Sequence, residues 1–185
     1  MGRAVWIAAM IAAMAMAAPG AAMTEDVECG SLKHLRIADL DQYDFTSCAR
    51  DTHRSRVTDG YAESKLEILV AQSRATFVVL RYEEAGRYTY FPVRSVADTV
   101  SEMFGRPMRN WGEERKHGRF VVTAVEVKIA DESPYLGCVA YTRRWGVVGL
   151  APGHKFILIG IYCAMDTLQL TDREIEEFLA GIETF

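Results

Sequence analysis

An α+β fold, mainly an antiparallel sheet with a few short helices, is predicted by three features of this 185-residue sequence. Runs rich in β-branched and aromatic residues, separated by turn residues, predict strands that follow one another closely. Only short segments have the apolar spacing of a helix, and one of these is expected to pack on the sheet as a C-terminal amphipathic helix. Four cysteines that follow an N-terminal apolar run indicate an exported chain stabilised by disulfides.

The first 22 residues have the organisation of a cleaved secretory signal peptide. Arg3 supplies the positive start, an apolar run follows, and Gly20 and Ala22 are small residues at the positions that a signal peptidase inspects. The alternative is a retained membrane anchor, but the run is shorter than the about 20 apolar residues that span a bilayer. We therefore expect cleavage after Ala22, a periplasmic or secreted protein, and no stable membrane span after cleavage.

The mature part, residues 23–185, has the length of a single domain. Its first segment, residues 23–60, is polar and shows little sustained period, so we expect it to be irregular and to wrap the domain. The stretch Leu66–Val70 fits both an alternating strand and one face of a helix. Its type stays open, although it is buried in either case.

A hairpin and a short helix are predicted next. Thr76–Tyr82 and Arg87–Val93 are rich in β-branched and aromatic residues and are separated by a short turn, which predicts that they pair as a hairpin. Ser95 with Asp98 three residues later resembles an N-terminal helix cap, and Gly105 ends the apolar spacing that follows.

Phe120–Ile129 is predicted as a strand, followed by a turn, and its end carrying Glu126 and Lys128 is expected to meet solvent. The last helix has the clearest signal in the chain, because Thr171 and Glu174 form a capping box at its start. Its apolar stripe should lie on the sheet. The stripe consists of Ile175, Phe178, Leu179 and Ile182.

The four cysteines, Cys29, Cys48, Cys138 and Cys163, all lie in the mature part. Structural disulfides are favoured over a reactive thiol because the chain has no Cys-x-x-Cys pair. Of the three pairings, we favour Cys138 with Cys163, because their flanking segments look like consecutive strands of one hairpin. This leaves Cys29 to pair with Cys48.

The register of this hairpin follows from its disulfide. Pairing Cys138 with Cys163 in an antiparallel ladder opposes residues whose numbers sum to 301. Because side chains alternate between the two faces of a strand, Arg144 then shares the face of the disulfide, whereas Trp145 and Phe156 lie on the other face.

The sequences Cys138-Val139-Ala140-Tyr141 and Gly160-Ile161-Tyr162-Cys163, followed by a capped helix, resemble the C-terminal end of small, uncharacterised exported bacterial proteins. The resemblance covers roughly the last 50 residues. It implies a disulfide hairpin and no activity.

The charge of the chain and the motifs that it lacks argue against several classes of function. The formal net charge is −4, which disfavours a nucleic-acid binder. The sequence lacks a Gly-x-Ser-x-Gly elbow, a His-Glu-x-x-His motif and a phosphate-binding loop, so no catalytic residue, metal ligand or cofactor is assigned. Basic residues instead gather in two segments, 105–120 and 143–155, each with a net charge of +3.

We therefore predict a binding or interaction module of unknown ligand. If the two basic segments converge, they would suit an anionic partner such as an acidic protein or an envelope component. The alternatives are two separate solvated loops, a purely structural role, and an unrecognised periplasmic hydrolase. The candidate binding residues are Arg109, Trp111, Arg143, Arg144, Trp145, His154 and Lys155.

Overall fold

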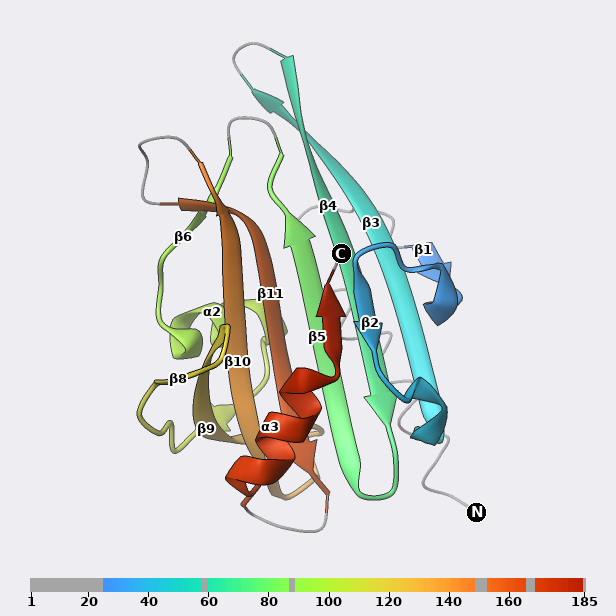
Figure 1. Cartoon of the computed structure of the whole chain (residues 1–185), viewed down its shortest axis with the longest axis vertical. Helices are drawn as coiled ribbons and strands as arrows, with labels where there is room; N and C mark the ends of the chain where they lie inside the picture. The colour runs from blue at the N-terminus through green and yellow to red at the C-terminus, as the bar shows by residue number, and fades with distance from the viewer. Residues whose placement is uncertain (1–24, 58–59, 87–88, 149–152, 166–168, 185) are drawn as a thin grey trace.

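The structure, a computed structural model, describes residues 25–57, 60–86, 89–148, 153–165 and 169–184. In this part of the chain, ten strands form one large antiparallel sheet, and short helices and a two-stranded sheet pack on its faces (Figure 1). The predicted α+β class is confirmed. The predicted signal peptide lies outside the described residues.

The large sheet consists of two meanders of consecutive antiparallel strands, which meet where β5 pairs with β11. The order across the sheet is β1-β3-β4-β5-β11-β10-β9-β7. The strands of the two meanders are β3 (Phe45–Val57), β4 (Gly60–Gln72), β5 (Thr76–Glu84), β9 (Phe120–Lys128), β10 (Tyr135–Val147) and β11 (Gly153–Ala164).

Four short strands complete the large sheet. β1 (Glu25–Val27) pairs with β3 at one edge. At the other edge, β7 (Met108–Arg109) and β8 (Arg115–His117) both pair with β9. β6 (Phe91–Pro92) pairs with the start of β11.

The front face, which points toward the viewer in Figure 1, carries α3 (Asp172–Ala180) and a small sheet of β2 (Leu35–Ile37) and β12 (Ile182–Thr184). Two 3₁₀ turns, η1 (Cys29–Ser31) and η2 (Leu40–Gln42), flank β2 in the chain. These elements bury an apolar cluster against the large sheet. Its largest buried members from the large sheet include Leu69, Leu80, Tyr82, Tyr141 and Leu158.

The capped C-terminal helix is confirmed as α3. The Thr171 hydroxyl accepts a hydrogen bond from the Glu174 backbone N–H, and the Glu174 carboxylate accepts one from the Thr171 N–H, which forms the predicted capping box. Phe178 stacks on Tyr162 of β11, with ring centroids 4.2 Å apart, so the apolar stripe lies on the sheet as expected. The helix ends before Ile182, which is buried as the first residue of β12.

The back face is covered by α2 (Val96–Phe104), the predicted short helix. Its cap is the Ser95 hydroxyl, which accepts a 2.9 Å hydrogen bond from the Asp98 backbone N–H. Gly105 ends it in the left-handed conformation that glycine adopts without strain. The buried residues of this face include Val100, Ile157, Ile159, Ile161 and the Cys138–Cys163 bridge.

Both disulfides pair as predicted, Cys29 with Cys48 and Cys138 with Cys163. The hairpin register is confirmed as well, with Trp145 opposite Phe156. Disulfides form and persist in oxidising environments, so the two bridges indicate an extracytoplasmic compartment. In the described part of the chain, no helix combines the length and the apolar character that a bilayer crossing needs.

Two expectations were wrong. Residues 23–60 are not irregular, because Phe45–Val57 forms β3, one of the longest strands. In the described chain, β5 takes β4 and β11 as its neighbours and β6 pairs with β11, so the predicted hairpin of Thr76–Tyr82 with Arg87–Val93 is not formed. The open choice at Leu66–Val70 is decided in favour of a strand, β4.

Candidate functional site

The candidate residues Arg143 and Arg144 are consecutive on β10, and the pleat of the strand sends them to opposite faces. Arg144 lies on the back face. Its guanidinium donates hydrogen bonds of 2.8 Å to the Thr99 hydroxyl of α2 and 3.2 Å to the Thr142 hydroxyl. Burial lowers the pKa of Arg144, although Glu114 opposes this effect. Arg144 therefore joins α2 to β10 and is turned away from Arg143 and Trp145.

Arg109 and Trp111 also lie apart from the front-face candidates. Arg109 opposes Glu126 on β9 and forms a 2.8 Å ion pair with it, whereas Trp111 packs partly buried against the back-face core. Thr142, the residue before Arg143, opposes Val121 of β9. Val121 and Glu126 are five residues apart on β9, which is about 16 Å along the strand. Arg109 and Trp111 therefore lie away from Arg143, although Arg119 of the same basic segment acts on Arg143 through its charge.

Arg143, Trp145 and Lys155 do come together, at the end of the front face where β5 ends. The Arg143 guanidinium lies 4.6 Å from the centre of the Trp145 ring, and the Trp145 and Phe156 rings stack with centroids 5.5 Å apart. The Lys155 ammonium lies 5.1 Å from the centre of the Phe156 ring. Each of these cations therefore sits beside an aromatic ring, an arrangement that is electrostatically favourable. His154, the neighbour of Lys155, opposes Phe91 of β6.

Two further rings extend this group, and we call His34, Tyr82, Trp145 and Phe156 the aromatic cluster. Tyr82 of β5 is 1% exposed and stacks with Phe156 and with His34, at centroid distances of 6.4 and 4.9 Å. Burial raises the pKa of Tyr82 well above its usual range, and the nearby carboxylates act in the same direction. The sequence did not single out His34 or Tyr82, because the segment before β2 meets β5 only in the folded chain.

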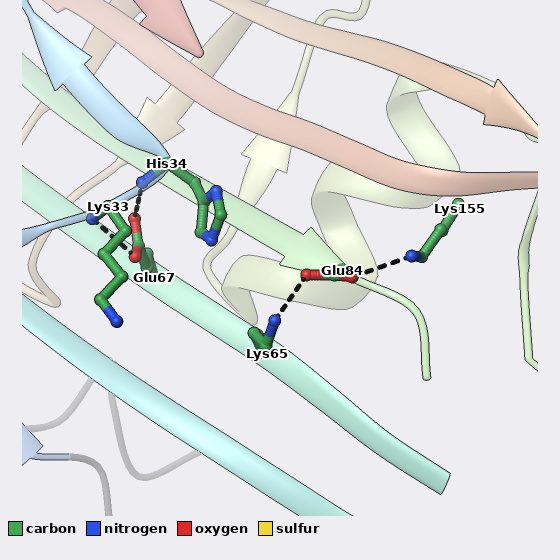
Figure 2. A network of polar contacts seen from close by, with 6 residues as sticks. All are labelled: Lys33, His34, Lys65, Glu67, Glu84 and Lys155. Carbon is green, nitrogen blue, oxygen red and sulfur yellow. Dashed lines mark hydrogen bonds and ion pairs between the residues drawn. The ribbon is translucent and has the colours of Figure 1, made fainter. Parts of the chain in front are cut away.

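Glu84, at the end of β5, is shared by two lysines at the rim of the aromatic cluster. Lys65 of β4 and Lys155 of β11 each place their ammonium nitrogen 3.1 Å from a different carboxylate oxygen of Glu84 (Figure 2). The Glu84 side chain is 16% exposed, whereas both lysines are 49% exposed. Burial opposes ionisation of Glu84, but hydrogen bonds from Lys155 and Lys65 hold its pKa below its ordinary value.

Glu67 of β4 is the second carboxylate in this region, and it is 2% exposed. Its two oxygens accept hydrogen bonds from the backbone N–H groups of Lys33 and His34, both at 2.9 Å (Figure 2). Figure 2 shows the Lys33 side chain pointing away from this carboxylate. The buried charge is therefore satisfied by backbone donors, and it fixes the segment that places His34 on Tyr82.

Arg143 also contacts β12, together with an arginine that the sequence did not single out as a binding residue. Arg143 donates a 2.7 Å hydrogen bond to the Thr184 hydroxyl, and Arg119 donates a 2.6 Å hydrogen bond to the carbonyl of Ile182. Burial, and then the charge of Arg119, lower the pKa of Arg143.

No protein-family model, curated protein or solved structure matches this chain. Its function is therefore inferred from the geometry of its own residues.

Clefts lie along the helix α3 in the described molecule. One of about 430 Å³ lies beside β9 and the start of α3. A second, of about 420 Å³, lies beside the C-terminal part of α3 and is lined by His117 and Arg119. A third, of about 420 Å³, lies between α3 and η2. Tyr43 lines it, and burial together with Tyr162 raises the pKa of Tyr43 to about 12. Among the described residues, no group of three or more His, Cys, Asp or Glu side chains is placed to hold a metal ion.

Proposed function

We propose that this protein is an exported binding module that holds an anionic partner on the front face of its sheet. One observation carries the proposal. The aromatic cluster lies beside three cations, Lys65, Arg143 and Lys155, and in the described chain only one partly exposed carboxylate, Glu84, forms ion pairs with them. This local excess of positive charge stands out on a chain with a formal net charge of −4.

The physical chemistry of the site favours a ligand that carries negative charge. Cations held beside aromatic rings keep a fixed position, so they can bind an anion with little loss of side-chain entropy. The partly buried Trp145 and Phe156 add apolar area next to the charges. Such a combination of rings and cations suits an acidic protein segment or an anionic envelope component.

Export is the second part of the proposal. The charged start, short apolar run and small residues at Gly20 and Ala22 support a signal peptide cleaved after Ala22. Two disulfides in the mature chain support a periplasmic or secreted location. N-terminal sequencing of the protein from the periplasm or medium tests this, and an intact residue 1 in the exported fraction would contradict it.

Binding is tested by calorimetry with the purified exported protein and defined probes. The anionic probes are polyglutamate, polygalacturonate and phosphatidylglycerol vesicles, and dextran and phosphatidylcholine vesicles are their neutral counterparts. We expect one anionic probe to bind with an affinity that falls as salt rises, because exposed charges are screened. Equal binding of anionic and neutral probes would overturn the proposal.

The matched variants localise the binding. Lys65→Gln combined with Lys155→Gln should weaken binding about tenfold, since two exposed pairs of about 0.7 kcal/mol each contribute about 1.4 kcal/mol together. Lys116→Gln, at an exposed lysine of β8, is the control and should leave the affinity unchanged. An equal effect of the double variant and the control would place the binding surface elsewhere.

A further inference from the structure

Two arginines gather at β12, next to the aromatic cluster. Arg119 donates to the carbonyl of Ile182 and Arg143 donates to the hydroxyl of Thr184. These two acceptors belong to positions two residues apart on one strand, which is a spacing of about 7 Å. Both guanidinium groups therefore lie along the same short strand, and the pKa of Arg143, which burial lowers first, is lowered further by the nearby charge of Arg119.

Neither arginine has an acidic partner within ion-pair distance in the part of the chain that the structure describes. Five other arginines of the described chain are paired with carboxylates, so these five are not equivalent to Arg119 and Arg143. Glu183, the acidic residue of β12 itself, opposes Arg36 of β2 and alternates in direction with Thr184. The paired arginines are Arg81, Arg94, Arg109, Arg115 and Arg173.

The Arg143 guanidinium is held in a fixed orientation and keeps N–H donors that no hydrogen bond of the described chain uses. The Trp145 ring, 4.6 Å from the Arg143 guanidinium, and the hydrogen bond to Thr184 hold this group in place. A guanidinium has five N–H donors, and Arg143 uses one of its terminal nitrogens for Thr184. The guanidinium groups of Arg119 and Arg143 repel each other, and the uncharged Ile182 carbonyl and Thr184 hydroxyl do not neutralise them. An anion that binds both is attracted by each and offsets this repulsion.

We propose that Arg119 and Arg143 form a recognition site for an oxyanion, a carboxylate or a phosphate, on the partner. This inference rests on the proposed function, because it names the chemical group that the front face recognises. The planar guanidinium fork matches the oxygen spacing of both groups, whereas Lys65 and Lys155 act as point charges at the rim.

The pair is tested directly by NMR titration of the exported protein with inorganic phosphate in one arm and sodium acetate in the other. We expect the Nε–Hε signals of Arg119 and Arg143 and the indole N–H of Trp145 to shift together and to saturate. The signal of Arg94, which is paired with Glu102, is the internal control. The arm that saturates at the lower concentration identifies the oxyanion. Linear shifts of all arginine signals in both arms would overturn the proposal.

Variants separate this site from the wider surface. Arg119→Gln with Arg143→Gln should weaken binding of the best anionic probe at least tenfold, and Arg143→Lys should weaken it less, because the charge remains while the fork is lost. Arg94→Gln should have no effect. If the probe binds the double variant and Arg94→Gln equally, the arginine site is wrong but the binding module stands. If no anionic probe binds the wild type, the proposed function fails, and the phosphate and acetate titrations still decide the arginine site.

Discussion

Arg143 and Arg144 are neighbours in sequence but belong to different environments. On the back face, Arg144 is enclosed by β10 and α2, and the hydroxyls of Thr99 and Thr142 accept its hydrogen bonds. On the front face, Arg143 lies over Trp145 beside a second arginine. Side chains of a strand alternate between its two faces, so two adjacent arginines have different surroundings. Arg144 is a structural cation and Arg143 a candidate binding cation, which the count of basic residues in the segment does not reveal.

The largest expected effect is the loss of stability when the disulfide on either face of the sheet is removed. Replacing Cys138 and Cys163 with alanine should lower the free energy of unfolding by about 3 kcal/mol, because the unfolded chain gains loop entropy. Replacing Cys29 and Cys48 should have an effect of similar size, since the two loops have similar lengths. Urea unfolding followed by circular dichroism checks both. We expect one transition in each variant, because both faces share the same sheet, and two separate transitions would show that the faces unfold independently.

A smaller effect distinguishes the two arginines. Arg144→Lys should lower the free energy of unfolding by about 1–2 kcal/mol, because one ammonium cannot replace the hydrogen bonds to both Thr99 and Thr142. Arg143→Lys should change it by less than about 0.5 kcal/mol while it weakens oxyanion binding. Thermal unfolding and calorimetry of the two variants give the measurement. Equal stability losses would remove the distinction between the faces.

The smallest expected effect is the pH dependence that Glu84 adds to the front face. Hydrogen bonds from Lys155 and Lys65 outweigh the opposing effect of burial and hold the pKa of Glu84 below its ordinary value of 4.5. A carboxyl with a lower pKa in the folded state stabilises the fold above its unfolded pKa, and this contribution is lost as the pH falls through the folded pKa.

Between about pH 7 and about pH 3, the wild type should therefore lose up to about 1 kcal/mol more stability than Glu84→Gln. Urea unfolding at several pH values provides the comparison. Glu102→Gln, at an exposed glutamate of α2 on the back face, is the control and should follow the wild type. A parallel loss in the wild type and Glu84→Gln would show that the ion pairs of Glu84 contribute nothing.

The C-terminal hairpin and both helices could be predicted because their signals are local. Cys138 and Cys163 gave the register, and Thr171 with Glu174 marked the start of α3. β3 was missed because it runs beyond the covered part of the sheet. Its C-terminal half, from Asp51 onward, is polar in sequence, and a polar stretch has no apolar period to detect.

The candidate site was only partly predictable for a related reason. Arg143, Trp145 and Lys155 lie on the two strands whose register was derived, so their proximity followed from local pairing. Arg119 and His34 reach the same region through contacts between distant parts of the chain, such as the pairing of β2 with β12. Alternation along one hairpin contains no information about which distant strand will cross it.

The position of the two disulfides has a consequence for how the chain is made. Each disulfide joins two cysteines that follow one another among the four cysteines of the chain. Cys29–Cys48 ends on β3, the first strand of the first meander, and Cys138–Cys163 joins β10 to β11 of the second. A chain that enters an oxidising compartment from its N-terminus presents its cysteines in that order. If the chain is exported as proposed, oxidation in this order would yield the native pairs without a step that exchanges mispaired bridges.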